Sequence, residues 1–219
     1  TVFDEKLDLF HLETEHISYV IGLADKRTYV GHVYYGKRIR LQDMRYLLRI
    51  GEPPYVPSEN NRERCSFYDT FPFEYSGNGV RDYRESTIAV TNVEGQQDIL
   101  PTYVSYAITK EKPLLAGLPS SFDRDKKVET LILHCTDPVL NVNVDLYYTV
   151  FEDTDMITRS VHICNQDEKP IYLTKALSAC LDMDDNDYEM LTLHGSWARE
   201  RQMDRRAIGY GKTSVGSIK

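Results

Sequence analysis

The sequence predicts a mostly β fold in which two large antiparallel sheets pack face to face, with at most one or two short helices. The 219 residues contain 16 tyrosines, and aromatic side chains favour strands over helices. Most apolar residues alternate with polar ones, which is typical of half-buried strands. Two of these runs, 142–152 and 170–183, are long for a strand, which favours large sheets. With 41% hydrophobic residues, the chain can bury a substantial core.

The segments expected to form strands share this alternation and are bounded by turn residues. They are residues 7–12, 16–23, 29–35, 87–93, 103–109, 128–136, 142–152, 156–164, 170–183 and 188–193. Residues 151–158, with the sequence FEDTDMIT, are expected to form a tight acidic hairpin between two of these strands.

One segment departs from the β pattern. In residues 38–50, Leu41, Met44, Leu47 and Leu48 fall at i, i+3, i+6 and i+7, and a glycine and a proline follow. This spacing predicts one short amphipathic helix.

The composition changes near residue 195. Residues 1–195 carry the β pattern and are predicted to form one domain, because no linker or repeat divides them. Residues 196–219 are rich in arginine and glycine and lack apolar periodicity. We interpret them as an exit segment that leads into a further part of a longer polypeptide.

The charge balance excludes several kinds of partner. A formal net charge of −8 and a pI near 5.3 argue against nucleic-acid and anionic-membrane binding, which need a concentrated basic surface. No apolar run approaches the roughly 18 residues that span a bilayer, and no signal peptide opens the sequence. We therefore expect a soluble chain that binds no nucleic acid and no membrane.

The cysteines indicate a reducing compartment. Cys65, Cys135, Cys164 and Cys180 form no CxxC pair and have no histidine at zinc-ligand spacing. The sequence also lacks an Asn-x-Ser/Thr glycosylation site. These features favour a cytoplasmic location and predict no metal site.

The sequence contains no recognisable catalytic motif. Its six histidines are scattered singly along predicted strands, where a lone histidine is more often a satisfied core or interface residue. No nucleophile elbow and no phosphate-binding glycine loop is present, so no nucleotide or other cofactor is expected. The acidic run 182–189 fails as a calcium loop, because Asp187 stands where the loop needs glycine.

Residues 66–85, with the sequence SFYDTFPFEYSGNGVRDYRE, are predicted to form a shaped loop. Asp69 and Arg81 lie on either side of several aromatic residues, and such a pair can bind a polyol: the carboxylate accepts from adjacent hydroxyls and the guanidinium donates to others. Two alternatives stay open at this point. The charges can form a salt bridge within the loop, and the aromatics can simply cover a sheet edge.

Several motifs then coincide, in order, with one family. FHLETEHISYVIGL, GHVYYGKRI, DTFPFEYSGNGVRDYRE, YEMLTLHGSWARERQ and GKTSVGS resemble the N-terminal domain of the glycoside hydrolase family 36 α-galactosidases. The resemblance runs from about Phe10 to Ser217 and implies a galactose-mutarotase-like β-supersandwich, placed ahead of a catalytic (β/α)8 barrel.

The resemblance also implies a function. Members of this family hydrolyse terminal α-galactosides such as melibiose and raffinose with retention, using two barrel aspartates that this chain does not contain. The fragment alone is therefore predicted to be inactive, with no catalytic residue of its own. Its expected partners are the galactoside, its own barrel and further copies in a dimer or tetramer.

In the family, a loop of this domain supplies an acid and an arginine to the sugar pocket, often in a neighbouring subunit. The matching residues are Asp69 and Arg81, and Trp197 is expected to pack against the barrel. The sequence departs from the family at 76–79, which reads SGNG, so the loop tip is expected to differ in shape.

Two other functions compete with this one. The first is an autonomous carbohydrate-binding or oligomerisation module, which would bind galactose tightly as an isolated chain. The second is an aldose epimerase, which would accelerate mutarotation of galactose without a barrel.

Overall fold

The computed structural model describes residues 1–50, 67–80, 82–122, 127–183 and 186–216. The chain divides into two compact units, Thr1–Asp182 and Met183–Lys219. The composition-based boundary at residue 195 stays a prediction; it falls within strand β11 (Glu189–Ser196) of the second unit. No helix in the described part of the chain is long and apolar enough to cross a membrane.

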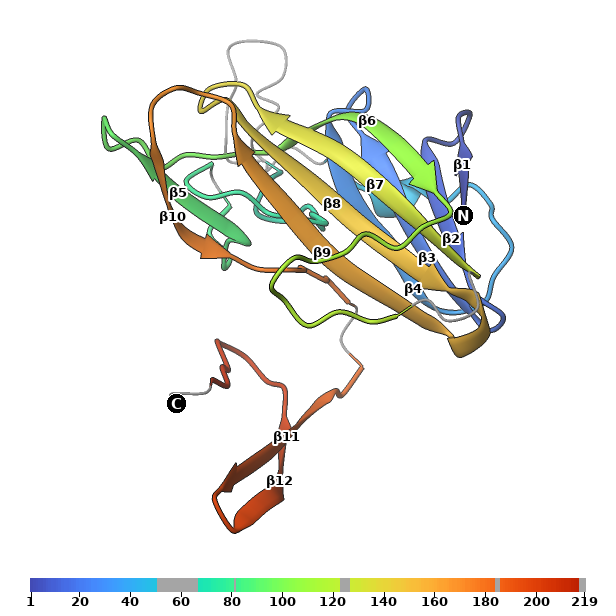
Figure 1. Cartoon of the computed structure of the whole chain (residues 1–219). Helices are drawn as coiled ribbons and strands as arrows, with labels where there is room; N and C mark the ends of the chain where they lie inside the picture. The colour runs from blue at the N-terminus through green and yellow to red at the C-terminus, as the bar shows by residue number, and fades with distance from the viewer. Residues whose placement is uncertain (51–66, 81, 123–126, 184–185, 217–219) are drawn as a thin grey trace. The chain divides into compact units, whose positions relative to one another are not determined.

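The first unit is built on two four-stranded antiparallel meanders that face each other (Figure 1). The first sheet contains β1 (Val2–Asp4), β2 (Leu9–Glu13), β3 (Ile17–Ala24) and β4 (Tyr29–Lys37). The second contains β6 (Thr102–Thr109), β7 (Val128–Asp137), β8 (Val142–Phe151) and β9 (Met156–Asn165). The predicted mostly β, two-sheet fold is therefore confirmed.

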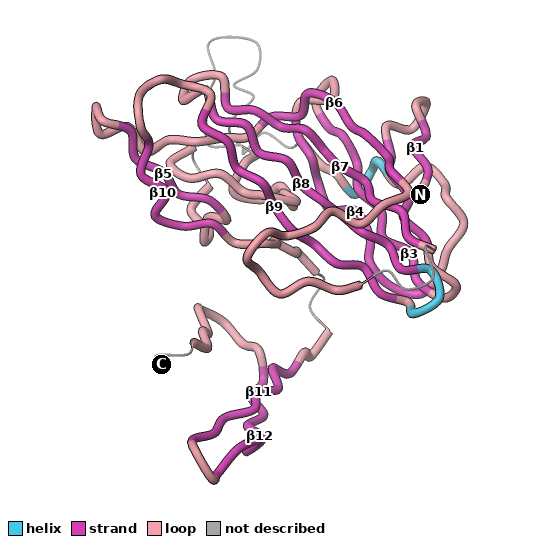
Figure 2. Tube along the Cα trace, in the orientation of Figure 1, coloured by secondary structure: helices cyan, strands magenta, loops and turns pink. Residues whose placement is uncertain are grey.

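A two-stranded sheet of β5 (Ile88–Asn92) and β10 (Ile171–Ala176) lies at one end of the sandwich (Figure 2). The prediction of one long strand over 170–183 was wrong, since β10 ends at Ala176. After a hydrogen bond from the Leu177 amide to the Thr87 carbonyl, the following residues have no strand partner among the described residues. Residues that alternate in polarity do not extend a ladder without a neighbouring strand to pair with.

The main core lies between the two large sheets. Strand β7 alternates buried and half-buried positions, and its buried Leu131 and Leu133 pack in one cluster with Phe10 and Ile21 of the opposite sheet. Strand β3 is buried along nearly its whole length, because its other face carries a second cluster that includes Val20. A strand covered on both faces reads as a continuous apolar run, which explains the segment ISYVIGLA.

The predicted helix over 38–50 was wrong, because only a short 3-10 helix, η1 (Arg45–Leu47), forms there. Met44 and Leu48 are buried in the second cluster, whereas Leu47 is 43% exposed. The Leu48 side chain occupies space beside two strand glycines, where an added Cβ at Gly22 or Gly31 would come within 2.5 or 2.6 Å of it. The apolar spacing therefore reflects two buried anchors rather than a continuous helical face.

The predicted acidic hairpin is confirmed: η2 (Glu152–Thr154) and Asp155, in the left-handed conformation with φ 50°, connect β8 to β9. The interpretation of residues 196–219 as an exit segment stays a prediction, but no strand was predicted there. The second unit contains a hairpin of β11 and β12 (Arg199–Ala207), whose sequence RERQMDRRA is almost entirely polar. A strand that buries neither face shows no apolar alternation, so β12 could not be predicted from periodicity.

Candidate functional site

The loop that begins at Phe67 runs along strand β4. The His32 amide donates to the Pro72 carbonyl at 2.7 Å, and the Glu74 amide donates to the Val30 carbonyl at 3.1 Å. A β-bridge between Gly31 and Phe73 lies within this contact. The loop is therefore fixed to the sheet by backbone hydrogen bonds.

The aromatic side chains of the loop pack against β4, the edge strand of its sheet, as the alternative of a covered sheet edge expected. Phe67, Tyr68, Phe71 and Phe73 are all buried, and their ring centroids lie 5.4 to 6.3 Å from that of Tyr29 in edge-on arrangements. The two tyrosine hydroxyls are hydrogen-bonded at 2.6 Å. Such edge-to-face pairs contribute beyond the area that they bury.

A fully buried carboxylate anchors the middle of the loop. Glu74 accepts hydrogen bonds from the hydroxyls of Tyr19, at 2.8 Å, and Tyr148, at 2.7 Å. The Nδ1 atom of His32 lies 2.9 Å from one carboxylate oxygen, and Nη2 of Arg159 lies 3.0 Å from the other. These four partners come from β3, β8, β4 and β9, so the carboxylate joins both large sheets to the loop.

The environment of Glu74 keeps it ionised. Burial by itself raises its pKa, but the hydrogen bond from His32 and the positive charge of Arg159 outweigh this and hold the pKa below its usual value. Burial beside this carboxylate raises the pKa of Tyr148 and Tyr19, so both phenols act as donors. The cluster is a satisfied buried charge, and the expectation that lone strand histidines are core residues is confirmed for His32.

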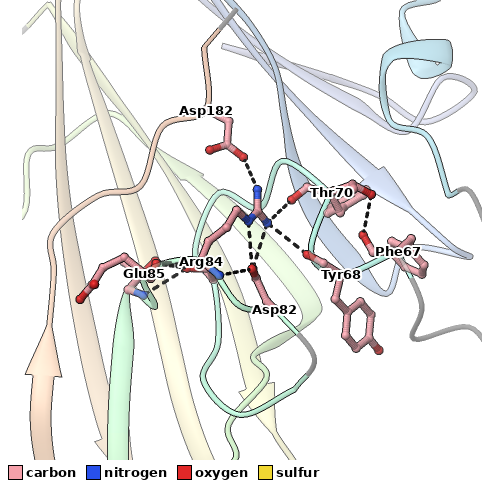
Figure 3. A network of polar contacts seen from close by, with 10 residues as sticks. Phe67, Tyr68, Thr70, Asp82, Arg84, Glu85 and Asp182 are labelled. Atoms are coloured by element: carbon pink, nitrogen blue, oxygen red, sulfur yellow. Dashed lines mark hydrogen bonds and ion pairs between the residues drawn. The ribbon is translucent and has the colours of Figure 1, made fainter. Parts of the chain in front are cut away.

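A second arginine organises the surface of the loop (Figure 3). Arg84 donates through Nη2 to the carbonyls of Tyr68, at 3.1 Å, and Phe71, at 2.7 Å. Its Nε and Nη2 form a fork on the Asp82 carboxylate, each at 2.9 Å, and Nη1 lies 3.0 Å from Asp182. One guanidinium thus connects both ends of the loop to the segment that follows β10.

The glycines at the loop tip are required by close packing. Asn78 and Ile99 exchange two backbone hydrogen bonds, each of 2.9 Å. A Cβ at Gly77 would collide with the Ile99 carbonyl, and Gly79 has φ 75° and lies against Asp98. The sequence SGNG at 76–79 therefore fits the loop tip against residues 98–100.

The structure places only one of the two predicted sugar ligands. Asp69 is exposed, in a turn between the buried Tyr68 and Thr70, whose amide donates to the Phe67 carbonyl at 3.1 Å. Arg81 lies outside the described residues, as does Cys65. The sugar-binding role of Asp69 and Arg81 stays a prediction.

Sequence reasoning missed the buried cluster. Arg159 lies within the strand sequence MITRSVHIC, which mixes apolar and polar residues, and a charged residue inside a strand is a signal for a buried ion pair. Its partner Glu74 lies in the loop sequence among other polar residues, with nothing local that marks it as buried. Nothing in the sequence connects the two, because they are 85 residues apart.

The described residues offer no metal site, since no group of three or more His, Cys, Asp or Glu side chains stands at a distance suited to an ion. Cys135 is buried, as expected for a small hydrophobe, and burial raises the pKa of its thiol to about 12. A cavity of about 330 Å³ lies beside β8 and β9 and is lined in part by Lys112, Ser120 and Arg159. Asp69 does not line it.

The two packed sheets, with a loop fixed along the edge strand β4 of one of them, define the first unit as an antiparallel β-sandwich domain. The sequence profile of the glycosyl hydrolase family 36 N-terminal domain matches residues 28–219. The chain belongs to this family, and the resemblance inferred from its motifs is confirmed.

Similar proteins include alpha-galactosidase Mel36A of Lactobacillus acidophilus, which is 35% identical over 213 residues, or 95% of this chain and 29% of that protein. The crystal structure of the alpha-galactosidase from Lactobacillus brevis matches with a TM-score of 0.90 and 31% identity, over 100% of this chain and 30% of that one.

A third similar structure is that of alpha-galactosidase AgaA from Geobacillus stearothermophilus, an A355E D548N variant in complex with raffinose. It has a TM-score of 0.84 and 31% identity over 93% of this chain and 28% of that one. The chain thus spans less than a third of the length of these relatives.

Proposed function

We propose that this chain is the non-catalytic N-terminal domain of a retaining α-galactosidase, a glycoside hydrolase of carbohydrate metabolism that removes terminal α-linked galactose. The observation that carries the proposal is the family match over residues 28–219, together with relatives that are α-galactosidases and more than three times as long. Raffinose bound to AgaA supports the substrate class.

In this proposal the catalytic aspartates belong to a (β/α)8 barrel outside the sequence, so the 219-residue chain alone is inactive. Residues 1–195 form the sandwich domain, and 196–219 lead towards the barrel. The protein acts in the cytoplasm as a homo-oligomer, without a cofactor.

The second unit supplies a surface for the barrel. Leu191, Leu193 and Met203 lie on one face of the β11–β12 hairpin and are 55 to 67% exposed, and Trp197 in its turn is 93% exposed. Large apolar side chains gathered on one small element are typical of an interface. This supports the proposal that Trp197 packs against the barrel.

The loop would help to complete the sugar pocket. The Asp69 carboxylate would accept hydrogen bonds from two adjacent hydroxyls, and the Arg81 guanidinium would donate to others. The buried aromatics and Glu74 support this role, because they fix the loop while Asp69 stays exposed. A ligand held on a rigid support loses little freedom when the sugar binds.

The test is Asp69→Ala in the full-length enzyme. We expect kcat/KM on an α-galactoside to fall by an amount that corresponds to about 2 to 5 kcal/mol, because a buried hydroxyl loses a charged partner. Asp153→Ala, in the exposed β8–β9 turn, is the matched control and should keep wild-type activity. Wild-type kcat/KM in the Asp69 variant would show that the loop does not contact the sugar.

A binding titration separates this proposal from an autonomous carbohydrate-binding module. A loop that completes another domain's pocket should bind galactose weakly when the 219-residue chain is isolated. Tight binding by the isolated chain would favour the module instead.

A further inference from the structure

The loop and the segment after β10 are joined at three points. The Leu177 amide donates to the Thr87 carbonyl at 2.9 Å, at the end of the loop. Deeper in the domain, Arg159 donates through Nη2 to the Glu74 carbonyl at 2.9 Å and through Nη1 to the Cys180 carbonyl at 2.6 Å. The third contact is the ion pair between Arg84 and Asp182, which is the last residue of the first unit.

Arg84 occupies the surface end of this arrangement. Its guanidinium contacts the carbonyls of Tyr68 and Phe71, and Asp69 lies between these two residues in the sequence. A planar guanidinium can hold several acceptors in a fixed geometry, which an ammonium group cannot do. The position of the Asp69 turn is therefore set by the same side chain that holds Asp182.

We propose that Arg84 is a positioning residue that clamps the turn around Asp69 to residues 177–182, the segment that leads into the second unit. The clamp fixes the turn relative to the exit of the chain, and so sets how the loop is presented to the sugar pocket. This inference rests on the proposed function, in which the loop helps to complete that pocket.

The chain contains a matched control for this clamp. Arg45 makes the same local fork on Asp43, with Nε at 2.9 Å and Nη2 at 2.7 Å from its carboxylate oxygens. Both arginines also donate their backbone amide to the aspartate two residues earlier, at 3.2 Å for Arg45 and 3.1 Å for Arg84. Only Arg84 adds the two carbonyls and the distant aspartate, so the pair isolates those contacts.

The first measurement is amide hydrogen exchange on the full-length enzyme, followed in residues 67–73. Arg84→Gln should speed exchange in residues 67–73 by about tenfold, because two backbone carbonyls and an ion pair lose their donor. Asp182→Asn removes one contact and should have a smaller effect. Arg45→Gln should leave the exchange rates of residues 67–73 unchanged. None of the three variants should change the exchange rates in β7 and β8.

The second measurement is kinetic and uses the full-length enzyme. A displaced loop weakens substrate binding, so Arg84→Gln should raise KM for an α-galactoside by about fivefold and change kcat by less than about twofold. Arg84→Lys should give an intermediate KM, since a lysine can reach Asp182 without holding both carbonyls. A purely structural role would lower the active fraction, and hence kcat, with KM unchanged.

Each outcome decides the inference. Unchanged exchange in Arg84→Gln would overturn the clamp. Faster exchange with unchanged KM, in an enzyme that loses activity on Asp69→Ala, would overturn the positioning role and leave the proposed function intact. If Asp69→Ala is also without effect, the loop does not contact the sugar, and the role of Arg84 in substrate binding falls with that part of the proposed function.

Discussion

Two Asp-x-Arg motifs in this chain have the same local geometry and different surroundings. In both, the arginine forks onto the aspartate two residues earlier, at distances between 2.7 and 2.9 Å. The Asp43 side chain is 53% exposed, whereas that of Asp82 is 2% exposed and its Arg84 reaches across to Asp182. The local sequence sets the fork, and the tertiary structure decides whether the fork holds anything else.

The ion pair of Glu74 and Arg159 is more deeply buried than either Asp-x-Arg pair. Its side chains are 0% and 13% exposed, and it connects both large sheets to the loop. Exposed ion pairs contribute little to stability because water screens them, whereas breaking a buried pair leaves a charge without a partner. Breaking each of the three ion pairs should therefore lower the free energy of unfolding by an amount that follows the burial of the pair rather than its N–O distance.

The largest effect is expected for Glu74→Ala. The substitution leaves Arg159 and two tyrosine hydroxyls without their acceptor, which should lower the free energy of unfolding by about 3 to 5 kcal/mol. Urea denaturation of the 219-residue chain measures this loss. Glu152→Ala, in the exposed turn, is the control; a loss below about 1 kcal/mol at Glu74 would mean that burial does not set the scale.

A pH titration of stability sharpens the same point. The pKa of Glu74 in the folded state lies below its ordinary value of 4.5, so its contribution is fully present above about pH 4.5 and is lost as the pH falls through the folded value. In Glu74→Gln the free energy of unfolding should depend less steeply on pH below 4.5. If the free energy of unfolding depended equally on pH below 4.5 in the variant and the wild type, the pKa of the carboxylate would be the same in the folded and unfolded states.

The smallest effect is expected for Arg45→Gln. Its fork with Asp43 holds the pKa of that carboxyl at about 2, through the hydrogen bonds from Arg45. Losing them should raise the pKa of Asp43 in an NMR titration, while the urea midpoint stays unchanged because both side chains are exposed. A shifted urea midpoint would show that the exposed Arg45 fork contributes to stability, which contradicts the contrast drawn with Arg84.

Much of the fold could be predicted from the sequence. Strands β7 and β8 bury alternate residues over most of their length, so their positions were predicted to within one residue. The prediction of a helix over 38–50 failed because Met44 and Leu48 are buried in the second cluster, where Leu48 fills space beside two strand glycines. Only the packed sheet provides that space. Strand β12 was not predicted, because it buries neither face and so shows no apolar alternation.

The candidate site could be predicted only in part. The loop was identified from its mixture of aromatics, glycines and charges, but the role of each residue depends on burial. Asp69 and Glu74 are both acids of one short stretch, yet the first is exposed and the second is completely buried. The side chains that surround Glu74 and make it differ from Asp69 are Tyr19, Tyr148 and Arg159, and they come from strands distant in the sequence.

The sequence by itself determined the strand pattern, the sandwich class and the family, because these follow from local alternation and from motifs that lie in order along the chain. Only the tertiary structure decided which charges are buried, which arginine holds the loop, and which segments lose their predicted helix or strand. The physical reason is that the free energy of a charge or an apolar side chain depends on what surrounds it, and folding brings those surroundings from residues far apart in sequence.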